Sequence, residues 1–85
     1  MNLNFKDDYN EDFKSIIAYN IKYYRKEKGI KLMDLAELLG VTPEYLKRIE
    51  SPNDEKKNCS LTLLYKISII FNKKLDDFLI DHREK

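Results

Sequence analysis

The fold of this chain is decided by residues 32–50, LMDLAELLGVTPEYLKRIE. The first part of this segment predicts a short helix, because its apolar residues recur at the spacing of one helix face, at Leu35, Ala36 and Leu39. Gly40 follows directly and can adopt the left-handed conformation in which helices commonly end. The helix is therefore expected to stop at a defined residue.

A second helix begins immediately after this turn. Thr42 is a good N-cap, and Pro43 suits the first helical position because its missing N–H would be unpaired there. Glu44 complements the positive end of the helix dipole, and core side chains follow at Leu46 and Ile49. Two helices joined by a tight turn with glycine are typical of a helix-turn-helix unit, whose second helix can lie in the major groove of DNA.

A longer helix precedes this unit. Its apolar residues are spaced by four, four and three positions, as on one helix face: Phe13, Ile17, Ile21 and Tyr24. Asn10 is the expected N-cap, and Gly29 supplies the left-handed residue that ends the helix. Tyr19 and Tyr23 lie one turn apart beside this stripe, and we expect their rings to flank the core.

Two more helices are predicted after the unit. The polar residues 51–58 indicate a loop, and Ser60 then caps a fourth helix. Its expected buried stripe consists of Leu61, Leu64, Ile67, Ser68 and Phe71. Asn72 can take the left-handed exit conformation, and a fifth, short helix contains residues 75–79. No stretch alternates apolar and polar residues for long enough to predict a strand.

These patterns predict an all-α chain, folded as a compact five-helix bundle around the helix-turn-helix unit. Residues 13–80 are expected to form the domain, because a chain of 85 residues has room for one. Residues 1–12 are an N-terminal extension, expected to be partly ordered, and residues 81–85 are a C-terminal tail, expected to fray.

Charge is distributed unevenly along the chain. The net charge is only +1, from 16 basic and 15 acidic residues. Residues 1–13 carry one lysine and four carboxylates, a net charge of −3, whereas residues 14–31 carry six basic side chains and one carboxylate, a net charge of +5. Two interpretations stay open: a surface that faces DNA phosphates, or a solvated helix face balanced by an acidic tail.

Several functions are disfavoured by what the sequence lacks. It has no paired nucleophile and base and no glycine-rich phosphate loop, so we expect no enzyme. Cys59 and His82 have no partners at a metal-binding spacing, and we expect neither a metal nor a cofactor. Cys59 is expected to be a small packed residue. No apolar run suits a signal core or a membrane span of ~20 residues, so we expect a cytoplasmic protein without membrane contact.

Six short segments together have the pattern of a known family: IKYYR at 21–25, KGI at 28–30, DLAELLGVT at 34–42, YLKRIE at 45–50, LYKI at 64–67 and LDDFL at 75–79. Through them the chain resembles the phage repressor/Cro-like (XRE-type) helix-turn-helix family over about residues 13–80. The resemblance implies a lambda repressor-like fold of five helices in which residues 42–50 contact DNA. It also implies a structural salt bridge between Arg25 and Glu50, which fixes orientation more than it adds stability.

The resemblance also implies which residues face DNA, when it is carried over position by position. Thr42, Pro43, Glu44 and Lys47 face the groove, and Tyr45 and Arg48 flank it toward the phosphates. Leu32 stands where many relatives have Gln and offers no hydrogen bond, and Pro43 replaces a residue that often contacts a base.

Base contacts would then depend on few side chains. Glu44 can accept from a cytosine amino group, Lys47 can donate to guanine, and Pro43 or the Thr42 methyl group can touch a thymine methyl group. For Glu44, the alternative is that it serves only the helix dipole. A nonspecific phosphate clamp is expected from Lys31, Lys47, Arg48, Asn53, Lys56, Lys57 and Asn58, although simple solvation is the alternative for Lys56 and Lys57.

Apolar residues of the fourth helix lie off its predicted buried stripe, at Leu63, Ile69 and Ile70. A monomer of this size would leave them exposed. We therefore expect a homodimer through the last two helices, with an interface formed by Leu63, Ile69, Ile70, Phe78 and Leu79. Two such copies contact half-sites ~34 Å apart. The alternative is that the C-terminal helix of the same chain covers these residues.

The sequence thus predicts a small transcription regulator, a repressor that binds a double-stranded DNA operator as a dimer. The alternative is a helix-turn-helix scaffold used mainly for protein–protein interaction, such as an antitoxin-like or anti-repressor partner, with weak DNA binding. The low net charge, Leu32 and Pro43 favour this alternative. The basic residues within 14–31, together with Lys47 and Arg48, favour DNA.

Overall fold

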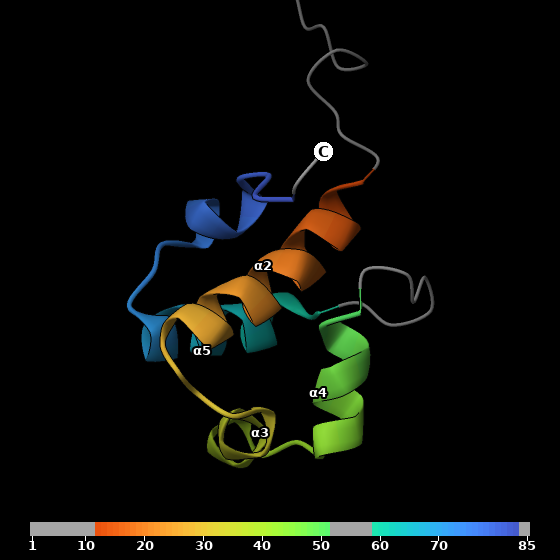
Figure 1. Ribbon diagram of the computed structural model, residues 1–85, viewed down its shortest axis with the longest axis vertical. Helices are drawn as coiled ribbons and strands as arrows, with labels where there is room; N and C mark the ends of the chain where they lie inside the picture. The colour runs from red at the N-terminus through yellow and green to blue at the C-terminus, as the bar shows by residue number, and fades with distance from the viewer. Residues whose placement is uncertain (1–11, 52–58, 84–85) are drawn as a thin grey trace, which may run out of the picture.

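The computed structural model describes residues 12–51 and 59–83, which form helices and the loops between them. The helices in Figure 1 are α2 (Phe13–Glu27), α3 (Leu32–Leu39), α4 (Pro43–Ile49), α5 (Leu61–Phe71) and the 3-10 helix η1 (Leu75–Leu79). The described residues are therefore all-helical, as predicted. They contain four α-helices and not five, because the last element is a single short 3-10 helix, the form that isolated short turns commonly take.

α2 ends where the sequence predicts. Gly29 has a φ of +70°, and the Ile30 N–H donates to the Arg25 carbonyl at 3.0 Å, which reverses the chain after the last turn. At its start, Asp12 is the residue before the helix. The predicted cap, Asn10, lies outside the described residues.

The buried face of α2 is wider than the predicted stripe. Ile21 and Tyr24 are buried as expected, but Phe13 and Ile17 are only half-buried. The additional buried residues are Ile16, Ala18, Asn20 and Arg25. α2 packs against both α5 and η1, so two neighbours bury its side chains instead of one.

The turn between α3 and α4 has the predicted geometry. Gly40 has a φ of +71°, and the Val41 N–H donates to the Ala36 carbonyl at 3.0 Å. The Thr42 hydroxyl accepts a hydrogen bond from the Tyr45 N–H at 3.1 Å and so caps α4. In Figure 1, α3 is seen end-on while α4 runs along the plane of the view, so the two axes are far from parallel.

α5 begins and ends as predicted, but its buried face differs. The Ser60 hydroxyl accepts from the Leu63 N–H at 3.1 Å, and Asn72 takes the left-handed exit with a φ of 55°. Leu61, expected in the core, is 73% exposed, whereas Leu63 is buried. The reason is that α2, α3 and η1 all pack against α5, which buries a broad face that includes Leu63 and leaves Leu61 outside.

The C-terminal segment is held against α2. The Asn20 side-chain amide donates to the carbonyls of Phe78 and Ile80, each at 2.7 Å. The Tyr24 hydroxyl hydrogen-bonds the Asp77 carbonyl at 3.0 Å and His82 Nε2 at 2.9 Å. The prediction that the tail frays is therefore wrong for residues 81–83, while residues 84–85 lie outside the described part.

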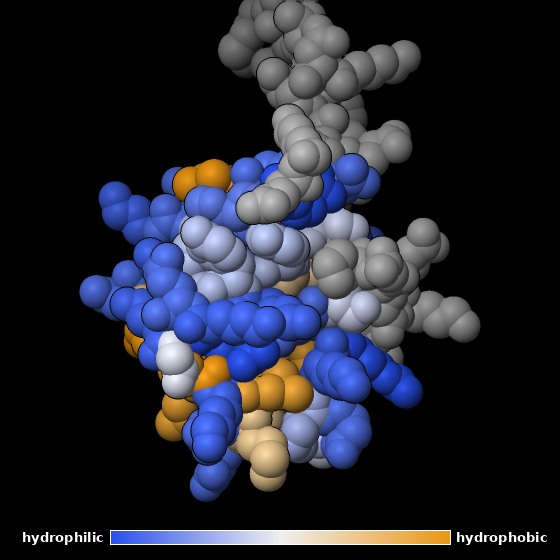
Figure 2. Space-filling model, viewed as in Figure 1, coloured by the Kyte–Doolittle hydropathy of each residue, from blue (hydrophilic) through white to orange (hydrophobic). Residues whose placement is uncertain are grey.

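One core joins the described elements. Its fully buried side chains come from every helix and include Ile21, Leu35, Leu46, Ile67, Phe71 and Phe78. The surface in Figure 2 is mostly hydrophilic, and apolar groups reach it mainly over α3, the helix on which Met33 and Leu38 are exposed. No helix of the described residues is long and apolar enough to span a bilayer.

Candidate nucleic-acid interface

α4 has a polar face toward solvent and an apolar face packed into the core. Leu46 and Ile49 are 0% and 2% exposed and fix the helix to the core. The exposed side chains of the helix and its cap are Thr42, Glu44, Lys47 and Arg48. Within the part of the chain that the structure describes, neither Lys47 nor Arg48 is paired with a carboxylate. Both side chains are exposed, so an external anion can reach them.

The remaining predicted contacts around α4 are less exposed. Pro43 and Tyr45 are half-buried, and Tyr45 packs against the core. Leu32, the first residue of α3, is also half-buried and packs against the core, so its position serves packing. Lys31, directly before α3, is exposed. Lys31 therefore lies at the N-terminal end of α3, and the turn to α4 follows the other end of that helix.

An ion pair ties this surface to α2. Arg25 Nε and Nη2 donate to the two carboxylate oxygens of Glu50 at 2.7 and 3.1 Å, and Nη1 donates to the Ile30 carbonyl at 2.8 Å. Both side chains are buried. Because Glu50 caps the C-terminus of α4, the two-pronged contact sets the orientation of α4 relative to α2.

The predicted loop contacts lie outside the described residues. This applies to Asn53, Lys56, Lys57 and Asn58, whereas Ser51, directly after Glu50, is described and half-buried. Among the described residues no group of three or more histidine, cysteine or acidic side chains has a metal-binding arrangement. Burial raises the pKa of the Cys59 thiol to about 11, which keeps it protonated and poorly nucleophilic near neutral pH.

The predicted dimer interface is corrected in two places. Leu63 is buried in the core of its own chain, and Phe78 is 0% exposed, with its ring beside those of Tyr24 and Phe71. Neither can contact a second copy. Ile70 is half-buried against the core, while Ile69 and Leu79 are 61% and 54% exposed.

The structure reveals another apolar row that the sequence interpretation missed. Leu61, Tyr65 and Ile69 are all exposed on α5. Their spacing of four residues, which places them along one side of the helix, is the signal that could have revealed the row. Because Leu61 is assigned to the buried stripe in the sequence-based prediction, the exposed row is not recognised there.

Known proteins similar to this chain are helix-turn-helix proteins. The profile of the helix-turn-helix family matches residues 21–78. The HTH-type transcriptional regulator SinR of Bacillus subtilis strain 168 is 38% identical over 69 residues, which are 81% of this chain and 60% of SinR. The chain therefore spans less than two thirds of the length of this relative.

Two solved structures have a similar fold. The N-terminal DNA binding domain of SinR from Bacillus subtilis has a TM-score of 0.67 and 37% identity, covering 82% of this chain and 99% of the solved one. The master regulator for biofilm formation SinR, solved in complex with DNA, has a TM-score of 0.63 and 39% identity, covering 75% and 98%. The similarity thus extends over the helix-turn-helix unit and the helices around it.

Proposed function

The chain belongs to the helix-turn-helix family, and from this premise we propose that it is a transcription regulator that binds double-stranded DNA sequence-specifically and represses as a dimer. α4 lies in the major groove and α3 crosses the backbone, the docking that this unit uses. The observation that carries the proposal is the outer face of α4, where Glu44, Lys47 and Arg48 are exposed on a helix anchored by Leu46 and Ile49. The SinR structure in complex with DNA supports the same assignment.

The roles within this interface follow from side-chain chemistry. Lys47 donates to a guanine and Glu44 accepts from a cytosine amino group, while the Thr42 methyl group and Pro43 touch a thymine methyl group. Tyr45, Arg48 and Lys31 contact phosphates and set the register of the helix. The loop residues Asn53, Lys56 and Lys57 remain predicted phosphate contacts.

Dimer formation is part of the proposal, with a revised surface. The revised surface keeps the exposed Ile69 and Leu79 from the interface predicted from sequence and adds Leu61 and Tyr65, which lie in one row with Ile69 on α5. Three exposed apolar side chains in one row favour contact with a second apolar surface over contact with water. A two-fold pair of copies places two α4 helices on half-sites ~34 Å apart.

The test is selection of bound fragments from random duplex DNA, at low and moderate salt. Lys47→Ala is expected to relax the preference at one base pair, with a loss of about 1–3 kcal/mol of discrimination. Lys66→Ala on α5 is the matched control, because it removes the same charge from an exposed site on another helix.

Two results would contradict the proposal at different levels. An unchanged preference in Lys47→Ala removes this residue from base recognition and leaves the function standing. Wild-type binding that is sequence-blind and abolished by modest salt contradicts the function itself, and supports a scaffold for protein–protein interaction instead.

A further inference from the structure

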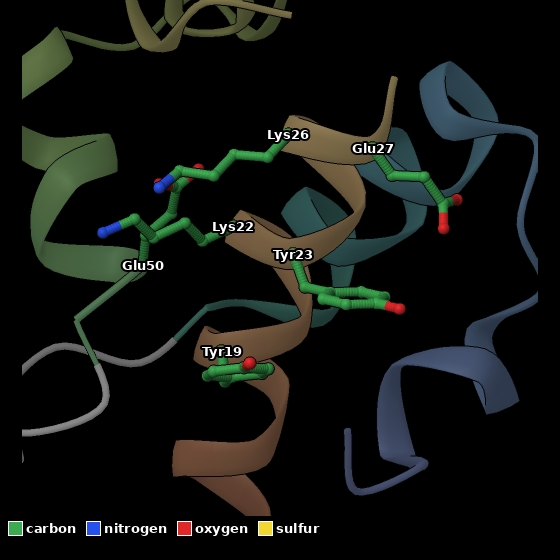
Figure 3. A pocket seen from close by; sticks show the side chains of 6 residues that line it. All are labelled: Tyr19, Lys22, Tyr23, Lys26, Glu27 and Glu50. Carbon is green, nitrogen blue, oxygen red and sulfur yellow. The ribbon is translucent and has the colours of Figure 1, made fainter. Parts of the chain in front are cut away.

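A groove runs along the exposed side of α2, beside the Arg25–Glu50 pair. It is lined by Tyr19, Lys22, Tyr23, Lys26, Glu27 and Glu50, and we refer to it as the α2 groove. In Figure 3, the side chains of Lys22 and Lys26 extend from α2 toward the side where Glu50 lies, and the rings of Tyr19 and Tyr23 lie along the same helix. On this face α2 is covered by hydrophilic groups (Figure 2).

The two carboxylates of the α2 groove are already compensated. Glu50 is held by Arg25 at 2.7 and 3.1 Å, and Glu27 lies 3.5 Å from Lys73 Nζ. By contrast, in residues 12–51 and 59–83 neither Lys22 nor Lys26 has a carboxylate oxygen within ion-pair distance. Among the residues that the structure describes, these two positive charges of the groove, one helical turn apart, are therefore without a carboxylate partner.

Stacked rings form the other edge of the groove. Tyr19 and Tyr23 stack with their centroids 6.1 Å apart, and Tyr23 stacks on His82 at 4.8 Å. Tyr23 also meets Tyr24 edge-on at 5.4 Å. These contacts hold the Tyr23 ring in place. In Figure 3 this ring points away from the side to which Lys22 and Lys26 extend, so the two lysines and not the Tyr23 hydroxyl supply the polar contacts on the Glu50 side.

We propose that the α2 groove binds a backbone phosphate of the same duplex whose bases α4 contacts. Lysine and tyrosine are both among the side chains that contact DNA phosphates. The groove also reaches the C-terminal end of α4, because the C-cap residue Glu50 is among its lining residues. This inference rests on the proposed function and adds a contact outside the helix-turn-helix unit. An acidic peptide carries the same negative charge as the DNA backbone. However, nothing would place it beside α4, whereas a duplex bound by α4 lies there.

The experiment compares two charge-matched double variants. Lys22→Gln/Lys26→Gln removes both cations of the groove, and Lys66→Gln/Lys74→Gln removes two exposed lysines from α5 and from the start of η1. Duplex affinity is measured over a series of salt concentrations. Removing one phosphate contact reduces the steepness of log Kobs against log salt by about 0.9.

For the groove variant we expect a slope less steep by about 1 to 2, for one or two phosphates, with the same fold loss on operator and on random DNA. The control is expected to keep the wild-type slope. An unchanged slope in the groove variant, with wild-type sequence preference intact, overturns the groove proposal but not the proposed function. Wild-type binding without any sequence preference overturns the proposed function.

A second probe separates phosphate from an acidic protein partner. Binding of poly-glutamate, measured on both double variants, is expected to be weak and equal. If poly-glutamate binds tightly and only the groove variant fails to bind it, while the DNA salt slope stays unchanged, the groove is an acidic-peptide site and the phosphate proposal is wrong.

Discussion

The Arg25–Glu50 pair shows how a single ion pair can orient a whole interface. Removing Arg25 as Arg25→Ala leaves the Glu50 carboxylate, 4% exposed, without its partner. Breaking a buried pair in this way costs about 3–5 kcal/mol, because the remaining charge stays desolvated. We expect the free energy of unfolding, measured in urea, to fall by this amount.

Replacing both Arg25 and Glu50 separates two causes of the lost stability. One is the loss of the ion pair, and the other is the buried carboxylate that is left without a partner. In Arg25→Met/Glu50→Leu no charge is left unpaired, so most of the stability is expected to return. Its operator affinity is expected to stay below wild type, because apolar packing does not reproduce the two-pronged geometry that orients α4. If Arg25→Ala alone unfolds at the wild-type urea concentration, the pair does not support the fold.

At the level of elements, the turn between α3 and α4 depends on a backbone conformation. Gly40 has a φ of +71°, and an added Cβ would meet no atom within 4 Å. The cost of Gly40→Ala is therefore conformational and not steric. We expect a loss of about 1–2 kcal/mol, the cost of a left-handed alanine, seen as a lower Tm in thermal unfolding.

Gly40→Asn is the control for this prediction. Asparagine tolerates the left-handed region better than alanine, so its Tm is expected to lie between those of Gly40→Ala and the wild type. Equal stability of all three proteins would show that α3 can end in another conformation.

The elements differ in how far they could be predicted. The α3–α4 unit could be predicted in full, because Gly40 and Thr42 act on neighbours within a few residues. The buried faces of α2 and α5 could not, because they depend on packing by η1. Asn20 illustrates this: its hydrogen bonds reach Phe78 and Ile80, 58 and 60 residues away, and no local pattern indicates them.

The candidate site, like the helices, could be predicted only in part. The anchoring residues Leu46 and Ile49 followed from their helical spacing, whereas the residues expected to face DNA came from the family resemblance. The Arg25–Glu50 pair was expected from the family resemblance. The Glu27–Lys73 pair was not, because it depends on how the segment after α5 packs against α2. Which basic residues of α2 have a carboxylate beside them among the described residues is seen only once the helices are packed.

Across the whole molecule, the position of charge matters more than its sum. A net charge of +1 gives little long-range attraction to DNA. Affinity must then come from locally concentrated cations, and in our proposals these are Lys47 and Arg48 on α4 and Lys22 and Lys26 in the α2 groove. Two copies on one duplex double that number, so dimer formation should add strongly to the affinity.

The dimer proposal can be tested at the exposed row of α5. Leu61, Tyr65 and Ile69 are 73%, 56% and 61% exposed, and a lysine within an apolar interface is costly to desolvate. Ile69→Lys is therefore expected to shift the protein from dimer to monomer in sedimentation equilibrium. Its affinity for a two-half-site operator should fall while that for one half-site is kept.

Leu38→Lys, the same kind of change at a 65% exposed position on α3, is the control and should still dimerise. If Ile69→Lys still dimerises, the dimer uses another surface. If the wild type stays monomeric at every concentration, it forms no dimer in free solution, and two copies could meet only on the DNA.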